Sequence, residues 1–247
     1  GTRRCLALCA QRALSSVWFL EALTAGELAR RGIDWNAFSS RAWCEIGCHG
    51  HSHEDFSGHV SGIALDRKHA ARVVADSTAL IEDLTGVRPR AFRAPYNRLT
   101  DALASALVEA DYAYDSSLHL RLSTTQQPFE PGTHRTADGN TIREIWLPKL
   151  PDPRGKVMSC YLWQLMEGNR QPDDYVHLVR HACEVAPGGL VQLALHPWHL
   201  AVSAAGEHFD DRERRQRLDA LGEVLDRVAE LPALQPVTFS AWLAERS

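Results

Sequence analysis

Three histidines in one short segment are the residues of this sequence best suited to chemistry. His49, His51 and His53 alternate with other residues directly after a short apolar run, residues 42–48. Neutral imidazoles at the end of a strand are natural ligands for Zn²⁺ or a similar divalent ion. An extended chain would direct all three side chains to one side, whereas a helical turn would bring only His49 and His53 onto one face. The segment therefore predicts metal binding, against the alternative of a polar surface loop.

Two later strand ends carry side chains that suit binding or catalysis. Arg93 leaves an apolar run and precedes Ala94, Pro95 and Tyr96, so a guanidinium able to orient a carboxylate lies beside a proline-fixed turn. Such a turn also exposes backbone N–H groups. Asp115 ends the next expected strand, where it can pair with Arg93, hold a histidine or cap a turn.

A fourth candidate lies near the end of the chain. His196 follows the apolar run 190–195 and precedes Pro197, Trp198 and His199. Proteins with α/β folds place catalytic groups at the carboxyl ends of their strands. His196 is therefore a candidate catalytic residue, and a hydrogen-bonded structural histidine is the alternative.

Apolar runs that alternate with amphipathic segments must position these residues, and they indicate an α/β fold. Buried strands are expected at residues 16–20, 42–48, 90–93, 112–115 and 190–196, with a weaker candidate at 235–239. Capping residues and helical spacing predict helices over residues 66–84, 100–110, 172–186 and 210–231. We expect one domain over residues 1–247.

Residues 123–156 depart from this alternation. They hold five prolines and the turn Asp138-Gly139-Asn140. This composition predicts a hairpin or an irregular excursion, such as often forms the wall of a binding site.

Composition restricts the classes of function. The chain has 247 residues, of which 45% are hydrophobic and 23% charged, so it is long and apolar enough to bury a core. The formal net charge of −4 argues against a nucleic-acid or anionic-membrane partner, and no apolar run approaches the roughly 18 residues of a membrane span. No signal peptide is visible, so a cytoplasmic location is expected. The six cysteines are expected to be reduced, structural thiols.

Taken together and in this order, the four segments resemble the polysaccharide deacetylase family, the NodB-homology or carbohydrate esterase 4 group. His49-x-x-x-His53 is similar to its His-Ser/Thr-x-x-His motif, with Gly50 in place of Ser or Thr. The Arg93-to-Tyr96, Tyr114-Asp115 and Leu193-x-Leu195-His196 segments resemble three later motifs. The resemblance covers roughly residues 14–243. It implies a distorted (β/α)7-type barrel.

The resemblance also implies a role for each residue. His49 and His53 would bind Zn²⁺, or another divalent metal such as Co²⁺ or Ni²⁺, which polarises the amide carbonyl and activates a water. Arg93 would hold the base carboxylate, and Asp115 would support the charged network. His196 would protonate the leaving amine. The Tyr96 backbone N–H would help to bind the oxyanion, and Leu193 or Leu195 would line the pocket for the acetyl methyl group. Pro95 and Trp198 are further candidate substrate contacts.

One part of the family pattern has no counterpart in this chain. The family opens with a strand that ends in an Asp pair, which supplies the general base and the third metal ligand. Here the acids before Asp34 are Glu21 and Glu27 only. Residues 16–20 align with the family's second strand, so the fold is expected to lack the first strand. Substitutes for the third ligand would be Asp55, Asp115 or His51.

These observations predict a zinc-dependent N-deacetylase acting on an N-acetylated sugar or glycoconjugate. Two alternatives stay open: an inactive carbohydrate- or partner-binding homologue, and a cyclic amide hydrolase of the same superfamily. Flat apolar rings suit stacking on sugars, so five aromatic residues are candidates for contact with the substrate. The set is Trp146, Tyr161, Trp163, Trp198 and Trp242.

Overall fold

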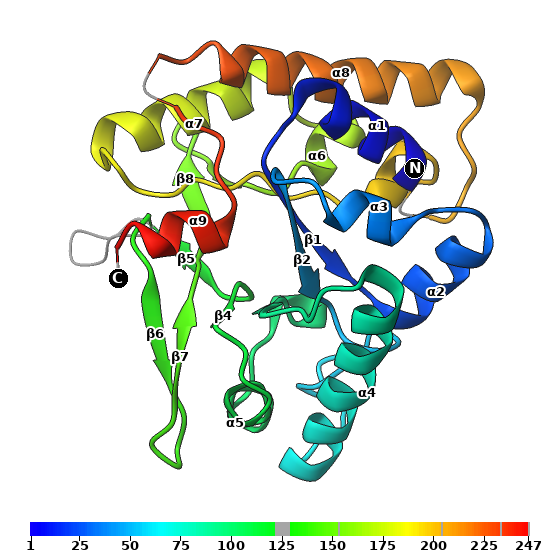
Figure 1. Ribbon diagram of the computed structural model, residues 1–247. Coiled ribbons are helices and arrows are strands. Elements are labelled where there is room, and N and C mark those ends of the chain that lie inside the picture. Colours follow the sequence, from blue (N-terminus) through cyan, green and yellow to red (C-terminus); the bar gives the residue numbers. More distant parts are fainter. Residues whose placement is uncertain (122–128, 153, 204, 233, 247) are drawn as a thin grey trace. The chain divides into compact units, whose positions relative to one another are not determined.

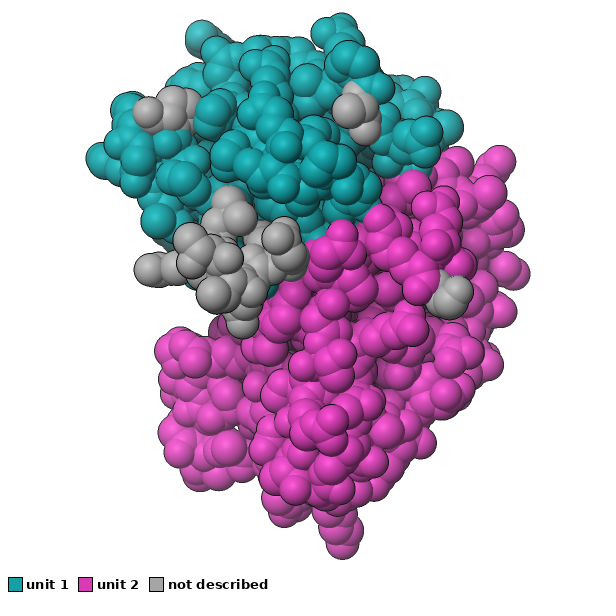
Figure 2. Space-filling model, turned by 90° about the vertical axis from the view of Figure 1, so that its left-hand side faces the viewer, with its two compact units in different colours: residues 1–14, 120–129, 147–236 teal, residues 15–119, 130–146, 237–247 magenta. Residues whose placement is uncertain are grey.

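The computed structural model describes residues 1–121, 129–152, 154–203, 205–232 and 234–246. The chain divides into two compact units, which Figure 2 draws in different colours. The unit here called the sheet unit consists of residues 15–119, 130–146 and 237–247. The other, here called the helical unit, consists of residues 1–14, 120–129 and 147–236. The single domain expected over residues 1–247 stays a prediction.

A mixed sheet of six strands forms the centre of the sheet unit (Figure 1). Its strand order is β1-β2-β3-β4-β7-β6, and every neighbouring pair is parallel except β6 with β7. The strands are β1 (Ser16–Leu20), β2 (Cys44–Cys48), β3 (Ala91–Phe92), β4 (Tyr114–Asp115), β6 (Gly132–Arg135) and β7 (Thr141–Glu144). The expected α/β class is confirmed, and β1 stands at one edge of this sheet.

The first four expected strands are present, with shorter bounds. β1 has the expected range, whereas β2 begins two residues later than predicted and β3 and β4 contain two residues each. Apolar runs mark burial, but the ladder hydrogen bonds that define a strand cover only part of each run. The hairpin expected within residues 123–156 is formed by β6 and β7 around Asp138-Gly139-Asn140, and residues 122–128 lie outside the described part.

Helices of the sheet unit begin where the sequence offers side-chain caps. The Asp66 carboxylate accepts from the His69 amide at the start of α4 (Arg67–Thr85), and Gly86 ends this helix with a φ of 69°. Thr100 caps α5 (Asp101–Glu109) in the same way. The remaining helices are α2 (Ala22–Arg30), α3 (Trp35–Ser39) and α9 (Phe239–Ala244).

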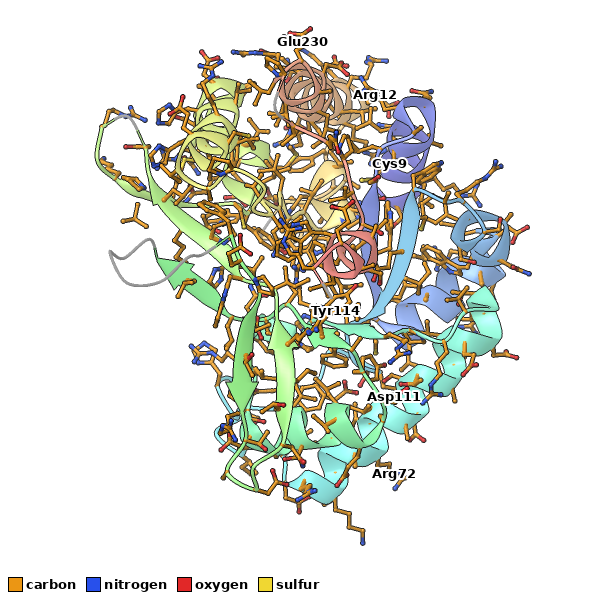
Figure 3. All side chains as sticks on the ribbon, turned by 60° about the vertical axis from the view of Figure 1, so that its left-hand side comes forward. Cys9, Arg12, Arg72, Asp111, Tyr114 and Glu230 are labelled. Carbon is orange, nitrogen blue, oxygen red and sulfur yellow. The ribbon has the colours of Figure 1, made fainter. Side chains whose placement is uncertain are left out.

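The weaker strand candidate at residues 235–239 is wrong. Thr238 caps α9, and the buried Phe239 and Trp242 lie on its inner side. Glu45 of β2 accepts hydrogen bonds from the Ser240 amide and hydroxyl at 2.9 and 2.7 Å, and from the Tyr114 hydroxyl. Burial raises the pKa of Glu45. Tyr114 is labelled in Figure 3.

The helical unit contains α1 (Thr2–Arg12), α6 (Trp163–Met166), α7 (Pro172–Val185) and α8 (Asp211–Ala229). Arg12, labelled in Figure 3, joins α1 to α8 through two hydrogen bonds to Asp226 of 2.6 and 2.8 Å. A three-stranded sheet has the order β5-β8-β9, with β5 (His119–Arg121), β8 (Leu147–Pro151) and β9 (Val157–Ser159). All six cysteines are free thiols, as predicted.

The strand expected at residues 190–196 is also wrong. Within this range only Ala194 makes a bridge, a parallel one to Tyr161, and the range has no ladder. Ala194 packs in a small core with Leu147 and Cys160. The apolar run thus corresponds to burial around Ala194 and not to a strand. No helix within the described ranges is long and apolar enough to cross a membrane.

We predict that Gly47→Ala destabilises the sheet unit. A Cβ at Gly47 would lie 2.6 Å from the Phe19 ring and 3.1 Å from the Ala91 carbonyl oxygen, so β1 or β2 must shift. Overpacking of this kind costs about 1–3 kcal/mol. The urea midpoint should fall, whereas the control Gly26→Ala in α2 has open space for its Cβ and should gain about 0.5–1 kcal/mol. Equal midpoints for the two variants would contradict the packing.

Candidate metal and hydrolytic site

The carboxyl ends of the parallel strands bring most of the predicted residues to one edge of the sheet. The residue after each strand donates its amide to the last residue of the neighbouring strand. These bonds are His49 to Leu20, Arg93 to Cys48, Ser116 to Phe92 and Ile145 to Asp115, all 2.8–2.9 Å long. Open α/β sheets bind ligands at this edge.

The His49 and His53 rings meet beyond the end of β2. Their centroids are 5.1 Å apart and their planes are inclined by 74°. Two imidazoles that bind one tetrahedral Zn²⁺ through nitrogens about 2.0–2.1 Å from the metal have ring centres roughly 5 Å apart. The chain reaches this arrangement by a turn with a positive φ at Gly50 and His53, and by neither an extended strand nor a helix.

A hydrogen bond fixes the orientation of His49. Its Nδ1 lies 2.7 Å from the carbonyl oxygen of Arg93. A carbonyl only accepts, so Nδ1 carries the proton and the lone pair of the neutral ring is on Nε2. Histidines that bind metals almost always donate their other N–H in this way.

The proposed substitute ligands have other roles. Asp55 accepts from the amides of His59, Val60 and Ser61, so its carboxylate orders the following loop. Asp115 is fully buried, and the Nδ1 of His51 is buried without a hydrogen-bond partner among the described residues. Within the described part of the chain, no group of three or more His, Cys, Asp or Glu side chains could hold a metal ion. The two imidazoles fit a divalent metal as two of its ligands.

Backbone strain is concentrated beside the imidazole pair. Positive φ angles occur at His53 (62°), Tyr96 (60°) and Asn97 (54°), although none of these is glycine. Such conformations cost about 1–3 kcal/mol each and are common at functional sites. The Tyr96 ring is 42% exposed and contacts the His53 ring edge-on, with centroids 4.8 Å apart, whereas Pro95 is buried. Of these two predicted substrate contacts, Tyr96 is thus the one that is accessible.

Arg93 is held by the neighbouring strand end. Its Nε donates to the Ser116 carbonyl at 2.7 Å and its Nη2 to the Ser116 hydroxyl at 2.8 Å. The guanidinium also lies over the Phe19 ring, 4.4 Å from its centroid. The expected orientation of a base carboxylate by Arg93 stays a prediction.

Asp115 pairs with a carboxyl group that sequence reasoning missed. Glu144 lies opposite it in the β4–β7 register, and both side chains are fully buried. Burial, and then the charge and hydrogen bond of Asp115, raise the pKa of Glu144 well above its ordinary value. Glu144 is thus the partner that holds a proton. The sequence signal was its spacing: Glu144 follows Ile142 by two residues, and side chains two apart on a strand share a face, which here is the buried one.

His196 belongs to the helical unit, where Tyr161 holds it. The Tyr161 hydroxyl lies 2.5 Å from Nδ1 of His196 and 3.0 Å from Nε2. The half-exposed Trp198 stacks on the His196 ring at 5.7 Å, and Leu195 is partly buried beside it in the chain. Burial lowers the pKa of the neighbouring His199 to about 4, so this ring is neutral. The expected approach of His196 to His49 and His53 stays a prediction.

The candidate stacking residues separate by exposure. Trp163 and Trp198 are 37% and 43% exposed, whereas Trp242 is buried. The Trp146 ring packs against Gly132, where a Cβ would lie 2.0 Å from it. Trp198 and Trp163 therefore remain the better platforms.

Comparisons with known proteins support the resemblance. The sequence model named Polysaccharide deacetylase matches residues 34–114. A peptidoglycan deacetylase of Helicobacter pylori is 35% identical over 74 residues, which are 30% of this chain and 23% of that protein. The aligned part thus spans about a quarter of the relative's length.

Solved structures show that the fold is shared. A protein described as a polysaccharide deacetylase from Mycobacterium smegmatis aligns with a TM-score of 0.64 at 21% identity, over 99% of this chain and 76% of its own. A 4-alpha-glucanotransferase from Thermococcus litoralis gives 0.73 at 10% identity, over 99% and 36%. A CE4 family pseudoenzyme from Bacillus anthracis gives 0.53 at 12% identity, over 98% and 59%.

We predict that Glu144→Gln changes the pH dependence of stability. Folded Glu144 keeps its proton above pH 4.5, where the unfolded chain loses it, so the folded state binds more protons and wild-type stability falls as pH rises. One such proton changes the free energy of unfolding by about 1.4 kcal/mol per pH unit. Glutamine carries no proton to lose, so the stability of the variant in urea unfolding should gain on that of wild type as the pH rises above 4.5. Parallel pH profiles would refute the protonated carboxyl.

Proposed function

We propose that this chain, whose residues 34–114 match the sequence model named Polysaccharide deacetylase, removes the acetyl group from an N-acetylated sugar. The reaction is hydrolysis of a linear amide, which yields acetate and an amino sugar. Polymers that contain N-acetylglucosamine are the proposed substrate class, because the curated relative is named a peptidoglycan deacetylase.

One observation carries the proposal: two imidazoles that can bind the same metal lie at the carboxyl edge of a parallel sheet. The ring separation of 5.1 Å and the Nδ1 bond to the Arg93 carbonyl both suit a divalent cation. Zn²⁺, Co²⁺ or Ni²⁺ bound there would polarise the acetyl carbonyl and lower the pKa of a bound water.

The other residues bind, orient or move protons. We assign Tyr96 to the substrate side, with its backbone N–H toward the oxyanion that forms in the transition state. We assign His196 the transfer of a proton to the leaving amine, with Tyr161 holding its ring. Trp198, which is 43% exposed and stacked on His196, would contact the apolar face of the sugar.

A second candidate function is carbohydrate binding without turnover. The base and third ligand of the family's Asp pair have no counterpart in this sequence, and the structural neighbours include a CE4 family pseudoenzyme. This candidate keeps the sugar contacts and omits hydrolysis. It therefore predicts glycan binding that is unaffected by added metal.

The decisive measurement is acetate release from N-acetylglucosamine oligomers and peptidoglycan with added Zn²⁺ or Co²⁺. We expect His49→Ala and His53→Ala to lower kcat/KM at least about 100-fold, because each removes one of two protein ligands. His69→Ala is the matched control, since His69 is an exposed histidine of α4. Chelation should abolish activity and Zn²⁺ should restore it.

The outcomes separate the candidates. Glycan binding without acetate release, at any metal concentration, would refute the deacetylase and favour the binding protein. Hydrolysis of cyclic imides or ureides with no release of acetate from sugars would assign the site to cyclic amides.

A further inference from the structure

A continuous set of hydrogen bonds runs from the buried carboxyl pair to His49, all within the sheet unit. Glu144 Oε1 accepts from the Ser117 amide at 3.0 Å and from the Leu118 amide at 2.8 Å. The Ser117 amide and hydroxyl also donate to the two oxygens of Asp115, both at 2.8 Å. One glutamate therefore fixes the backbone immediately after β4.

Ser117 also contacts the segment that orients His49. Its hydroxyl accepts from the Ala94 amide at 2.7 Å while it donates to Asp115. Ala94 follows Arg93, whose carbonyl accepts from His49 Nδ1. Arg93 is also tied to Ser116, and the Ser116 hydroxyl donates to the Ile145 carbonyl at 2.7 Å.

We propose that Glu144 is a positioning residue for the His49–His53 pair, acting through Ser117 and the Arg93–Ala94 backbone. Two carboxyl groups without exposure are costly to bury, and an apolar pair would fill the same space. Here they supply acceptors for three donors, the buried amide and hydroxyl of Ser117 and the partly buried amide of Leu118. The network holds the Arg93 carbonyl where the His49 ring can donate to it.

The proposal rests on the proposed function for its metal, but one of its readouts does not need the metal. The first readout is the tautomer of His49 in the metal-free protein, measured by ¹⁵N NMR of the imidazole. The second is the affinity for Co²⁺, measured by its visible absorption. Outer partners of ligating histidines change metal affinity by about 10–100-fold.

Three variants test the positioning role of Glu144. Glu144→Ala removes the side-chain acceptor of the Leu118 amide and one of the two acceptors of the Ser117 amide, and Ser117→Ala breaks the link to Ala94. Both should weaken Co²⁺ binding about tenfold or more and mix the two His49 tautomers. Glu144→Gln keeps a carbonyl oxygen that can accept from the Ser117 and Leu118 amides, so it should bind Co²⁺ within about threefold of wild type. Ser117→Ala tests the path even where Glu144→Ala does not fold.

Asp152→Ala is the matched control for loss of a buried carboxylate. Asp152 is buried in the helical unit and pairs with Arg170 at 2.5 Å. This variant should lose stability and keep both His49 readouts.

The outcomes distinguish the two proposals. Wild-type affinity and tautomer in Glu144→Ala and Ser117→Ala would overturn the positioning role, as would a Glu144→Gln variant that binds as weakly as Glu144→Ala. Absence of Co²⁺ binding by wild type would refute the proposed metal site alone, because the tautomer of His49 still reports on Glu144.

Discussion

The parallel register of β2, β3, β4 and β7 is the constraint on which the candidate site depends. The first residue after each of these strands donates its amide to the last residue of the neighbouring strand. These residues therefore all lie at the same edge of the sheet. His49, Arg93, Ser116 and Ile145 occupy these four positions. Residues that are far apart in the sequence thereby become contacts, and the hydrogen bond from His49 to Arg93 is one of them.

This edge combines rigid support with local strain. Phe92, Ala94 and Pro95 are buried around the Arg93 segment, whereas His53, Tyr96 and Asn97 have positive φ angles. Strain of this kind persists only where surrounding contacts determine the backbone. The Ser117 hydroxyl on the Ala94 amide and the Asp55 carboxylate on the next loop are two such contacts. Side chains whose backbone is held by such contacts are preorganised for binding.

Sequence reasoning identified the site better than its surroundings. His49, Arg93 and Asp115 were expected at strand ends and lie there, because apolar runs mark where strands end, whereas the roles of these residues and of His53 stay predictions. Glu144 was missed because its partner lies 29 positions earlier and only the β4–β7 register joins them. The strand expected around Ala194 failed for a related reason: apolar character reports burial, and ladder pairing depends on a distant segment.

Under the proposed function, the edge position of β1 and a third metal ligand are related by geometry. β1 pairs with β2 through all five of its residues, and β2 carries His49 at its end. A strand added in parallel on the far side of β1 would end at the same edge, near Leu20, whose carbonyl already accepts from the His49 amide. A carboxylate at such an end would complete the ligands of a metal held by His49 and His53. In the proposed site, a strand paired with β1 would therefore also be able to supply the third ligand, because parallel pairing fixes where its last side chain stands.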